Sequence, residues 1–293
     1  MQKILINITL HFFAIMPLRL NHLIGSWTGL VLYYLKGKTW KISKTNIQLC
    51  FPEMTPPQQE AILKNSLIEL GKQFTEMGPM LLWSSEKTLS LLTGVSGREH
   101  MDAAMQTGKG VLLLTPHLGC WEIAGLYLGA NIPVTILYSR PKIKAIDDLV
   151  RHSRIRSGAT LVAADASGVK SIFKTLRQGN GTGILPDQNP DDTNSGVFAP
   201  FFGIQTLTMT FISRLASKTG ASIVIGYAER LPKGKGYHLH IRQADPDIAN
   251  PDPLISAAAL NKTVEKYIRE VPAQYQWSYK RFKKRPEGEE KLY

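Results

Sequence analysis

The residues of this chain best suited to chemistry are His117 and Glu122, which follow a short apolar run at 111–114. The run predicts a buried strand, and the apolar pattern that begins at 121 predicts a helix. A histidine just beyond a strand lies at the carboxyl edge of a sheet, where open α/β folds bind ligands. Glu122 falls in the first helical turn, where the dipole favours a carboxylate and from which it could reach the imidazole. Such a pair is a general base without a protein nucleophile, so we expect a substrate hydroxyl to supply the nucleophile.

A structural role is the competing interpretation, because a histidine and a glutamate at this spacing often occur together by chance. The context favours function, since the strand, His117, Gly119 and the helix follow one another in the order that such a site requires. The other histidines lack metal-type spacing with carboxylates or cysteines, so we predict no metal and no other cofactor.

A second group of candidate residues follows the next predicted strand, at 133–138. Arg151 and Arg154 are three residues apart and would share one helix face. At the same sheet edge as His117, either could hold a phosphate or stabilise an oxyanion. A solvated helix face is the alternative interpretation of such a charge run. The cations of this segment are Arg140, Lys142, Lys144, Arg151, Arg154 and Arg156.

Asp187 and Gln188 come directly after another predicted strand, at 182–185. We expect them to support the site, although an aspartate beside a proline is also a common turn former. The apolar and aromatic run at 197–204 contains a proline and a glycine, so we interpret it as a loop that could line a pocket for an apolar ligand.

Strand and helix patterns alternate from residue 97 onward, which predicts a mostly parallel sheet covered by helices, an α/β fold. A turn at 231–236 predicts one antiparallel hairpin. A long helix over 55–82 precedes this region, and Gly71 and Gly78 are expected to break it. Strands are expected at 111–115, 133–138, 159–163, 182–185, 222–228 and 237–243. Helices are expected at 97–106, 121–129, 143–157, 168–178, 206–218 and 253–270.

The first 45 residues predict an N-terminal membrane anchor, and residues 46–293 one catalytic domain. Two apolar runs within 4–35 are interrupted at Arg19, Asn21 and His22, and neither reaches the roughly 20 residues needed to span a bilayer. The stretch is therefore a tilted span or an interfacial segment, and a buried helix pair is the alternative. Lys36, Lys38, Lys41 and Lys44 follow and place the rest of the chain in the cytoplasm.

The formal net charge of +12 favours anionic partners such as lipid headgroups, phosphorylated substrates or an acidic carrier. The basic and aromatic segment at 277–285 suits an anionic membrane surface or an acidic partner. It would also suit RNA, but no common nucleic-acid recognition signature is present. The two cysteines, Cys50 and Cys120, exclude a disulfide framework and are compatible with a reducing cytoplasm.

Five motifs together resemble the late acyltransferases of lipid A biosynthesis, the lauroyl and myristoyl type of Gram-negative bacteria. They are HLGCWE at 117–122, RHSRIRSGA at 151–159, GILPDQNP at 183–190, FAPFFG at 198–203 and QYQWSYKRFKKRP at 274–286. The resemblance covers most of the chain, and several ordered motifs are far more specific than the histidine–glutamate spacing alone.

The resemblance implies a glycerol-3-phosphate-acyltransferase-like fold on the cytoplasmic face of the inner membrane. It implies transfer of a fatty acyl chain from acyl carrier protein to a hydroxyl of a lipid A precursor. By position, His117 and Glu122 match the catalytic pair, Arg154 a functional arginine, with Arg151 close by, and Asp187 an acidic residue after a strand. Trp121, Phe198, Phe201 and Phe202 are then candidates for the acyl pocket. Another lipid acceptor, an acyl-thioester hydrolase and a non-enzymatic basic membrane or RNA-binding protein remain open alternatives.

Overall fold

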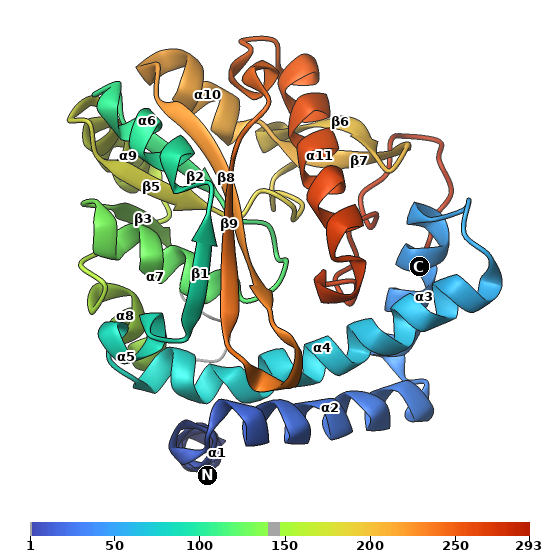
Figure 1. Ribbon diagram of the computed structural model, residues 1–293. Coiled ribbons are helices and arrows are strands. Elements are labelled where there is room, and N and C mark those ends of the chain that lie inside the picture. Colours follow the sequence, from blue (N-terminus) through green and yellow to red (C-terminus); the bar gives the residue numbers. More distant parts are fainter. Residues whose placement is uncertain (1, 140–146) are drawn as a thin grey trace.

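The computed structural model describes residues 2–139 and 147–293, and its centre is a five-stranded sheet in the order β1-β9-β8-β2-β5 (Figure 1). β2 is parallel to both β5 and β8, β1 is parallel to β9, and β8 and β9 form an antiparallel hairpin. The mostly parallel sheet predicted from the sequence is confirmed. The strands are β1 (Leu92–Ser96), β2 (Val111–Leu114), β5 (Gly181–Ile184), β8 (Ser222–Arg230) and β9 (Tyr237–Gln243).

Helices cover both faces of this sheet because β2 is apolar at every position. Val111 and Leu113 pack in one cluster with residues of α6 (Arg98–Gln106) and α7 (Trp121–Asn131). Leu112 packs on the other face with residues of α9 (Ala166–Arg177) and α10 (Phe211–Thr219). A strand buried on both faces reads as a continuous apolar run, which is how 111–114 was identified. The remaining helices of this region are α5 (Ser85–Leu89), α8 (Asp147–Ile155) and α11 (Pro253–Glu270).

A separate parallel pair, β3 (Thr135–Tyr138) and β4 (Thr160–Ala163), adjoins the central sheet at β5. An isolated bridge joins Val134 to Gly181, and the described residues beyond it form no further ladder between β3 and β5. The two strands therefore meet at one end and separate toward their carboxyl ends.

The segment at 196–209 is a β-hairpin, which corrects two expectations from the sequence. The strands β6 (Gly196–Phe201) and β7 (Ile204–Met209) pair antiparallel, so the loop expected at 197–204 is a strand and a turn, and the helix expected from 206 begins at Phe211. Polar and apolar residues alternate from Thr206 to Met209, which is the strand period. The short β1 was not predicted, because it contains Gly94 at an irregular register and lies at the sheet edge.

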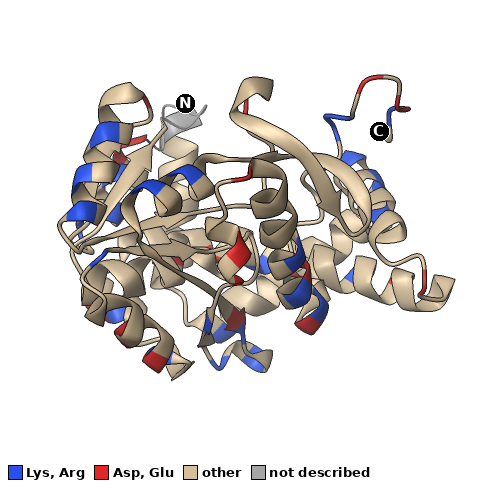
Figure 2. Cartoon of the chain, turned by 90° about the horizontal axis from the view of Figure 1, so that it is seen from above, with Lys and Arg blue, Asp and Glu red and all other residues tan. Residues whose placement is uncertain are grey.

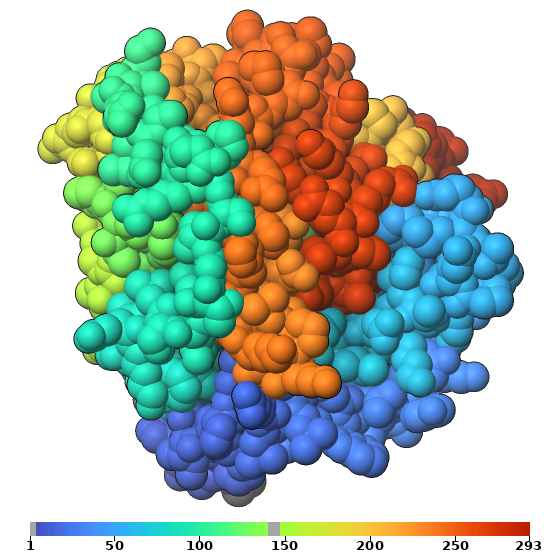
Figure 3. Space-filling view, in the orientation of Figure 1, coloured from blue at the N-terminus to red at the C-terminus, as the bar shows by residue number. Residues whose placement is uncertain are grey.

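Three N-terminal helices lie beneath the β8–β9 hairpin at one end of the molecule (Figures 1 and 3). They are α1 (Gln2–Ile15), α2 (Leu18–Leu35) and α4 (Pro56–Leu82). A fourth helix, α3 (Lys38–Cys50), connects α2 to α4 along the chain. α4 is continuous, so the breaks expected at its glycines do not occur. Instead the glycines allow close helix crossing: a Cβ at Gly71 would lie 2.0 Å from the Gly25 carbonyl oxygen, and one at Gly29 2.2 Å from the Leu67 oxygen.

α2 packs against α4 through one face and leaves the opposite face exposed. His22, Gly25 and Gly29 are buried on the packed face, whereas Leu23 is 55% and Trp27 66% exposed. The alternative interpretation of the N-terminal stretch, a buried helix pair, therefore holds for the packed face of α2 but not for its exposed face. Across residues 2–139 and 147–293, no helix is both long enough and apolar enough to cross a membrane.

Much of the basic and aromatic segment at 277–285, expected to meet a membrane surface or an acidic partner, packs into the core instead. Trp277, Arg281 and Phe282 are each about 2% exposed or less. The Arg281 guanidinium donates to the Leu207 carbonyl oxygen at 2.7 Å and lies 5.3 Å from the Phe201 ring centroid. Lys284 donates to the carbonyl oxygens of Pro190 and Asp191. Most cations of this basic segment thus bind the β6–β7 hairpin and the loop after β5.

Candidate active site

His117 lies in a tight loop between β2 and α7 that is held on two sides by backbone pairing. Leu118 forms an antiparallel bridge with Tyr275, and Gly119 a parallel bridge with Ala228. Gly119 has φ +62°, and a Cβ there would lie 2.0 Å from the Ala228 carbonyl oxygen. Glycine is therefore required at this position, and the loop presents the imidazole at the carboxyl edge of the sheet, as predicted.

The imidazole of His117 is held by Asp187. Nδ1 of His117 lies 2.8 Å from Oδ1 of Asp187, and the His117 backbone N–H donates to Oδ2 at 3.0 Å. Nε2 accepts from the Gln188 side-chain amide at 3.1 Å, so the tautomer that fits both contacts carries its proton on Nδ1. The unprotonated Nε2 is then free to act as a base toward any hydroxyl that takes the place of the Gln188 amide.

Asp187 stays ionised although it is 3% exposed. Burial disfavours its charge, but attraction to His117 and hydrogen bonds from the imidazole and the His117 backbone outweigh burial. The pKa of the Asp187 carboxyl consequently lies below its ordinary value. A buried carboxylate that orients a histidine through Nδ1 is the arrangement that keeps Nε2 basic in catalytic triads.

Glu122 does not contact His117, which corrects the expectation that it would hold the imidazole. Its carboxylate lies 3.7 Å from Nη2 of Arg154, and its side chain is 38% exposed. The physical reason is the direction of the ring: Nδ1 of His117 faces the loop after β5, and the Trp121 ring packs edge-on at 4.9 Å from the imidazole. Asp187, expected only to support the site, occupies the position assigned to Glu122.

The three described arginines of the basic segment have different surroundings. Arg154 pairs with Glu122, whereas Arg151 is exposed to solvent. Arg156 donates to the carbonyl oxygens of Met80 and Leu81 at the end of α4 and so is a packing residue. Of these three arginines, Arg154 is the one that lies beside Glu122 and lines the cavities described next. Arg140, Lys142 and Lys144 lie outside the described residues.

Two cavities meet at Trp121, Glu122 and Arg154. The larger, which we call the β3–β5 cavity, has a volume of ≈ 780 Å³ and is lined by the facing parts of β3 and β5, with Gly125 of α7 and Val169 of α9. The smaller, the α4 cavity of ≈ 300 Å³, is lined by Met77 and Met80 of α4 and by Tyr138. Volumes of this size suit extended apolar ligands.

Trp121 lines both cavities, but the three phenylalanines expected to form an acyl pocket with it line neither. Phe201 is 1% exposed and packs against Phe282 and Tyr275. Phe202 has φ +50° at the hairpin turn and packs against Phe51 and Trp277. Phe198 lies within β6. The three phenylalanines were expected in a pocket-lining loop, but this segment is a hairpin, and they therefore do not line a cavity.

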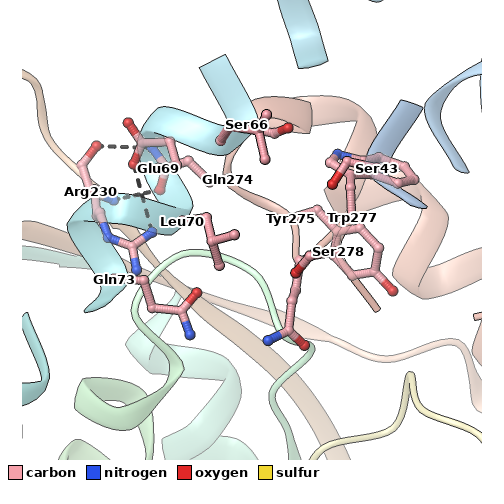
Figure 4. A pocket seen from close by; sticks show the side chains of 12 residues that line it. Ser43, Ser66, Glu69, Leu70, Gln73, Arg230, Gln274, Tyr275, Trp277 and Ser278 are labelled. Carbon is pink, nitrogen blue, oxygen red and sulfur yellow. Dashed lines mark hydrogen bonds and ion pairs between the residues drawn. The ribbon is translucent and has the colours of Figure 1, made fainter. Parts of the chain in front are cut away.

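A buried ion cluster of Arg230, Glu76 and His22 holds the His117 loop through its contact with Gly119. The sequence analysis did not predict this cluster. Arg230 at the end of β8 donates to the Gly119 carbonyl oxygen at 3.0 Å and to Glu76 of α4 at 2.8 Å. His22 of α2 contacts the same Glu76 carboxylate at 2.6 Å. Figure 4 shows Arg230 beside Glu69 and Gln274, with which it also interacts. Attraction to Glu76 keeps Arg230 charged in spite of burial and holds its pKa above the ordinary range.

The C-terminal segment completes the loop. The Gln276 backbone N–H donates to the His117 carbonyl oxygen at 3.0 Å, and its side chain accepts from Gln188 at 3.2 Å. Tyr279 accepts from the Asn189 N–H at 3.0 Å. Because these contacts join residues far apart in sequence, no local pattern could have identified them.

A family model of bacterial lipid A biosynthesis acyltransferases matches residues 2–284. The lipid A biosynthesis lauroyltransferase of Escherichia coli (strain K12) is 31% identical over 93% of this chain and 88% of its own length. The palmitoleoyltransferase of the same strain is 27% identical over 86% of this chain and 81% of its own. A lipid A biosynthesis acyltransferase of Haemophilus influenzae is 26% identical over 94% of this chain and 86% of its own.

Proposed function

The chain belongs to the bacterial lipid A biosynthesis acyltransferase family and is an acyltransferase, and on that premise we propose that it moves a fatty acyl chain from a carrier-protein thioester to a hydroxyl of a lipid A precursor. The observation that carries the proposal is the His117–Asp187 pair next to Trp121, whose ring packs against His117 and lines a large, mainly apolar cavity. A base without a protein nucleophile suits direct transfer between two bound substrates.

In the proposed reaction Nε2 of His117 takes the proton of the acceptor hydroxyl while the hydroxyl oxygen attacks the thioester carbonyl carbon. The carbon–sulfur bond then breaks, and the imidazolium returns the proton to the leaving thiolate. Asp187 keeps Nδ1 protonated and stabilises the imidazolium. The products are a new ester and a free thiol, so neither a cofactor nor a covalent enzyme intermediate is needed.

Arg154 and Glu122 act as a positioning pair in this proposal. The Arg154 guanidinium reaches both cavities and could neutralise the oxyanion or a phosphate of the acceptor. Glu122 holds it from a distance of 3.7 Å, with both side chains partly exposed. A pair at the rim of two cavities is well placed to meet both substrates, with Trp121 as the apolar surface between them.

A basic groove between α9 and α10 supports an acidic donor. Lys170, Lys174 and Arg177 of α9 and Lys218 of α10 line it, around Phe173. Within the described part of the chain, none of these four cations forms an ion pair. In the view from above, Lys and Arg residues lie on the helices at the left of the molecule and also near its centre and right (Figure 2). Such a surface attracts an acidic carrier protein.

The exposed face of α2 supports attachment to the inner membrane, with the catalytic domain on the cytoplasmic side. Leu20, Leu23, Trp27, Val31 and Tyr34 follow helical spacing and are 42–69% exposed. Lys36 and Lys38 follow at the end of this face. An apolar face bordered by lysines is typical of helices that lie in the membrane interface, so we propose interfacial attachment in place of a span.

The proposal is tested by acyl transfer from labelled acyl carrier protein to a tetra-acylated lipid A precursor, with wild type and His117→Ala. We expect transfer by wild type alone. Release of free fatty acid without acylation would contradict the acceptor, and equal transfer by both proteins would contradict His117 as the base.

The donor is tested with Lys174→Glu/Arg177→Glu, which reverses two charges of the groove. Transfer from the carrier protein should fall at least tenfold, while transfer from acyl-coenzyme A, if measurable, should change little. Equal losses with both donors, or none with the carrier, would contradict docking on this groove.

A further inference from the structure

The β3–β5 cavity lies where the two strands separate. Val134 and Gly181 bridge the strands at one end, and farther along Ile136 and Leu137 face Gly183 and Ile184 across the cavity. One side is covered by α7, through Trp121 and Gly125, and the other by α9, through Val169. The cavity therefore passes between two strands, and helices on both faces of the sheet contribute to its walls.

Gly125 leaves this cavity open along α7. It follows Trp121 by four residues, so it lies on the same helix face about 6 Å farther along the helix axis. A Cβ added at Gly125 would meet no atom within 4 Å. The neighbouring Gly129 differs, because a Cβ there would meet the Ser157 carbonyl oxygen at 2.9 Å. Close packing thus explains Gly129 but not Gly125.

A glycine in the interior of a helix destabilises that helix relative to alanine. Here no neighbour requires the missing side chain, and φ is not in the left-handed region. The space gained is cavity volume next to Trp121. Gly183, on the β5 wall, could also accept a side chain, since a Cβ there would lie 3.8 Å from the Leu128 methyl group of α7, an ordinary contact.

From this geometry we propose that Gly125 sets the length of the acyl chain that the enzyme accepts, an inference that rests on the proposed function. With its thioester at His117, the donor chain runs along Trp121 and passes the bare helix surface at Gly125. A side chain at 125 occupies the path of the chain and shortens the usable cavity. Apolar pockets discriminate one methylene by roughly 10–200-fold, so a small obstruction has a large effect on preference.

The experiment compares wild type, Gly125→Ala and Gly125→Leu with carrier proteins that bear octanoyl to palmitoyl chains in one competing mixture. Transferred and released acyl groups are both quantified by mass spectrometry. We expect Gly125→Leu to lose its longest wild-type substrates at least tenfold relative to shorter ones, and Gly125→Ala to show a smaller shift. Gly183→Ala, on the β5 wall of the same cavity, should shift preference the same way.

Folding does not obscure this test, because alanine and leucine are better helix formers than glycine and the added Cβ meets no atom within 4 Å. Gly37→Leu is the matched control: Gly37 is exposed, lies before α3 and also has no atom within 4 Å of an added Cβ. Unchanged preference in Gly125→Leu, or equal loss with every chain, would overturn the inference. Wild-type protein inactive with every chain would instead overturn the proposed function.

Discussion

His117 and Asp187 occupy equivalent places just beyond the carboxyl ends of two neighbouring parallel strands, β2 and β5. Leu114 of β2 pairs with Ile184 of β5, and each functional residue stands three positions beyond its partner in this pair. The strand register therefore brings together an imidazole and a carboxylate that are 70 residues apart in sequence, at 2.8 Å. Parallel pairing of two short strands is what assembles this dyad.

Asp187→Asn should lower kcat far more than it changes KM. An asparagine can accept from the imidazole but carries no charge to stabilise the imidazolium, and the equivalent change in a serine-protease triad costs about 10⁴-fold. Steady-state acyl transfer measures this. Asp102→Asn, at an exposed residue of α6, is the control and should retain wild-type rates. A loss below tenfold in Asp187→Asn would contradict the dyad.

The same variant tests the charge of Asp187 through stability. Its native pKa lies below the unfolded value of about 3.9, so between the two the unfolded state binds more protons and stability rises with pH. The contribution is complete above this window and is lost as pH falls through the native pKa. Urea unfolding should therefore show the largest gap between wild type and Asp187→Asn near neutrality, shrinking in acid. A gap that widened in acid would show that Asp187 is protonated in the native protein.

Glu122 and Arg154 should matter to turnover more than to folding. Both side chains are partly exposed, and ion pairs of that kind contribute about 1 kcal/mol or less to stability. We expect Arg154→Gln and Glu122→Gln to lower kcat/KM by at least tenfold each, with losses that are not additive in the double variant. Arg151→Gln, one turn earlier on α8 and exposed, should behave like wild type. Equal effects at 151 and 154 would indicate a general charge effect.

The buried cluster of Arg230, Glu76 and His22 predicts a large effect on stability. Arg230→Met removes the guanidinium partner of the Glu76 carboxylate, which is 1% exposed, and breaking a buried pair costs about 3–5 kcal/mol. Adding Glu76→Met should recover most of that loss, because an apolar replacement of both charges is often nearly neutral. Denaturant unfolding of the single and double variants measures this. Additive losses would contradict a mutual pairing.

Local patterns predicted the elements that are continuous in sequence. The fully apolar 111–114 run and the turn at 231–236 led to a mostly parallel sheet with one antiparallel hairpin, and His117 was placed at its edge. The edge strand β1 was missed, and the strands expected at 133–138 and 159–163 form a separate pair. The hairpin at 196–209 was missed because aromatic residues, a proline and a glycine obscured the alternation from Thr206 to Met209.

The partner of His117 was misassigned for a different reason. A carboxylate five residues away is visible in sequence, whereas the approach of Asp187 depends on which strands are neighbours and in what register. Arg230 and Gln276 are likewise recognisable only through contacts across the sheet and with the chain end. Sequence reasoning therefore located the base but not the groups that hold it.

The contact between Gln276 and His117 makes the order of synthesis matter. The N-terminal helices leave the ribosome first and domains fold from that end during synthesis. The segment that closes the His117 loop and fastens the β6–β7 hairpin is translated after the strands that bring His117 and Asp187 together. The dyad can thus assemble before its loop is closed, and the loop is held on both sides only once residue 276 has been made.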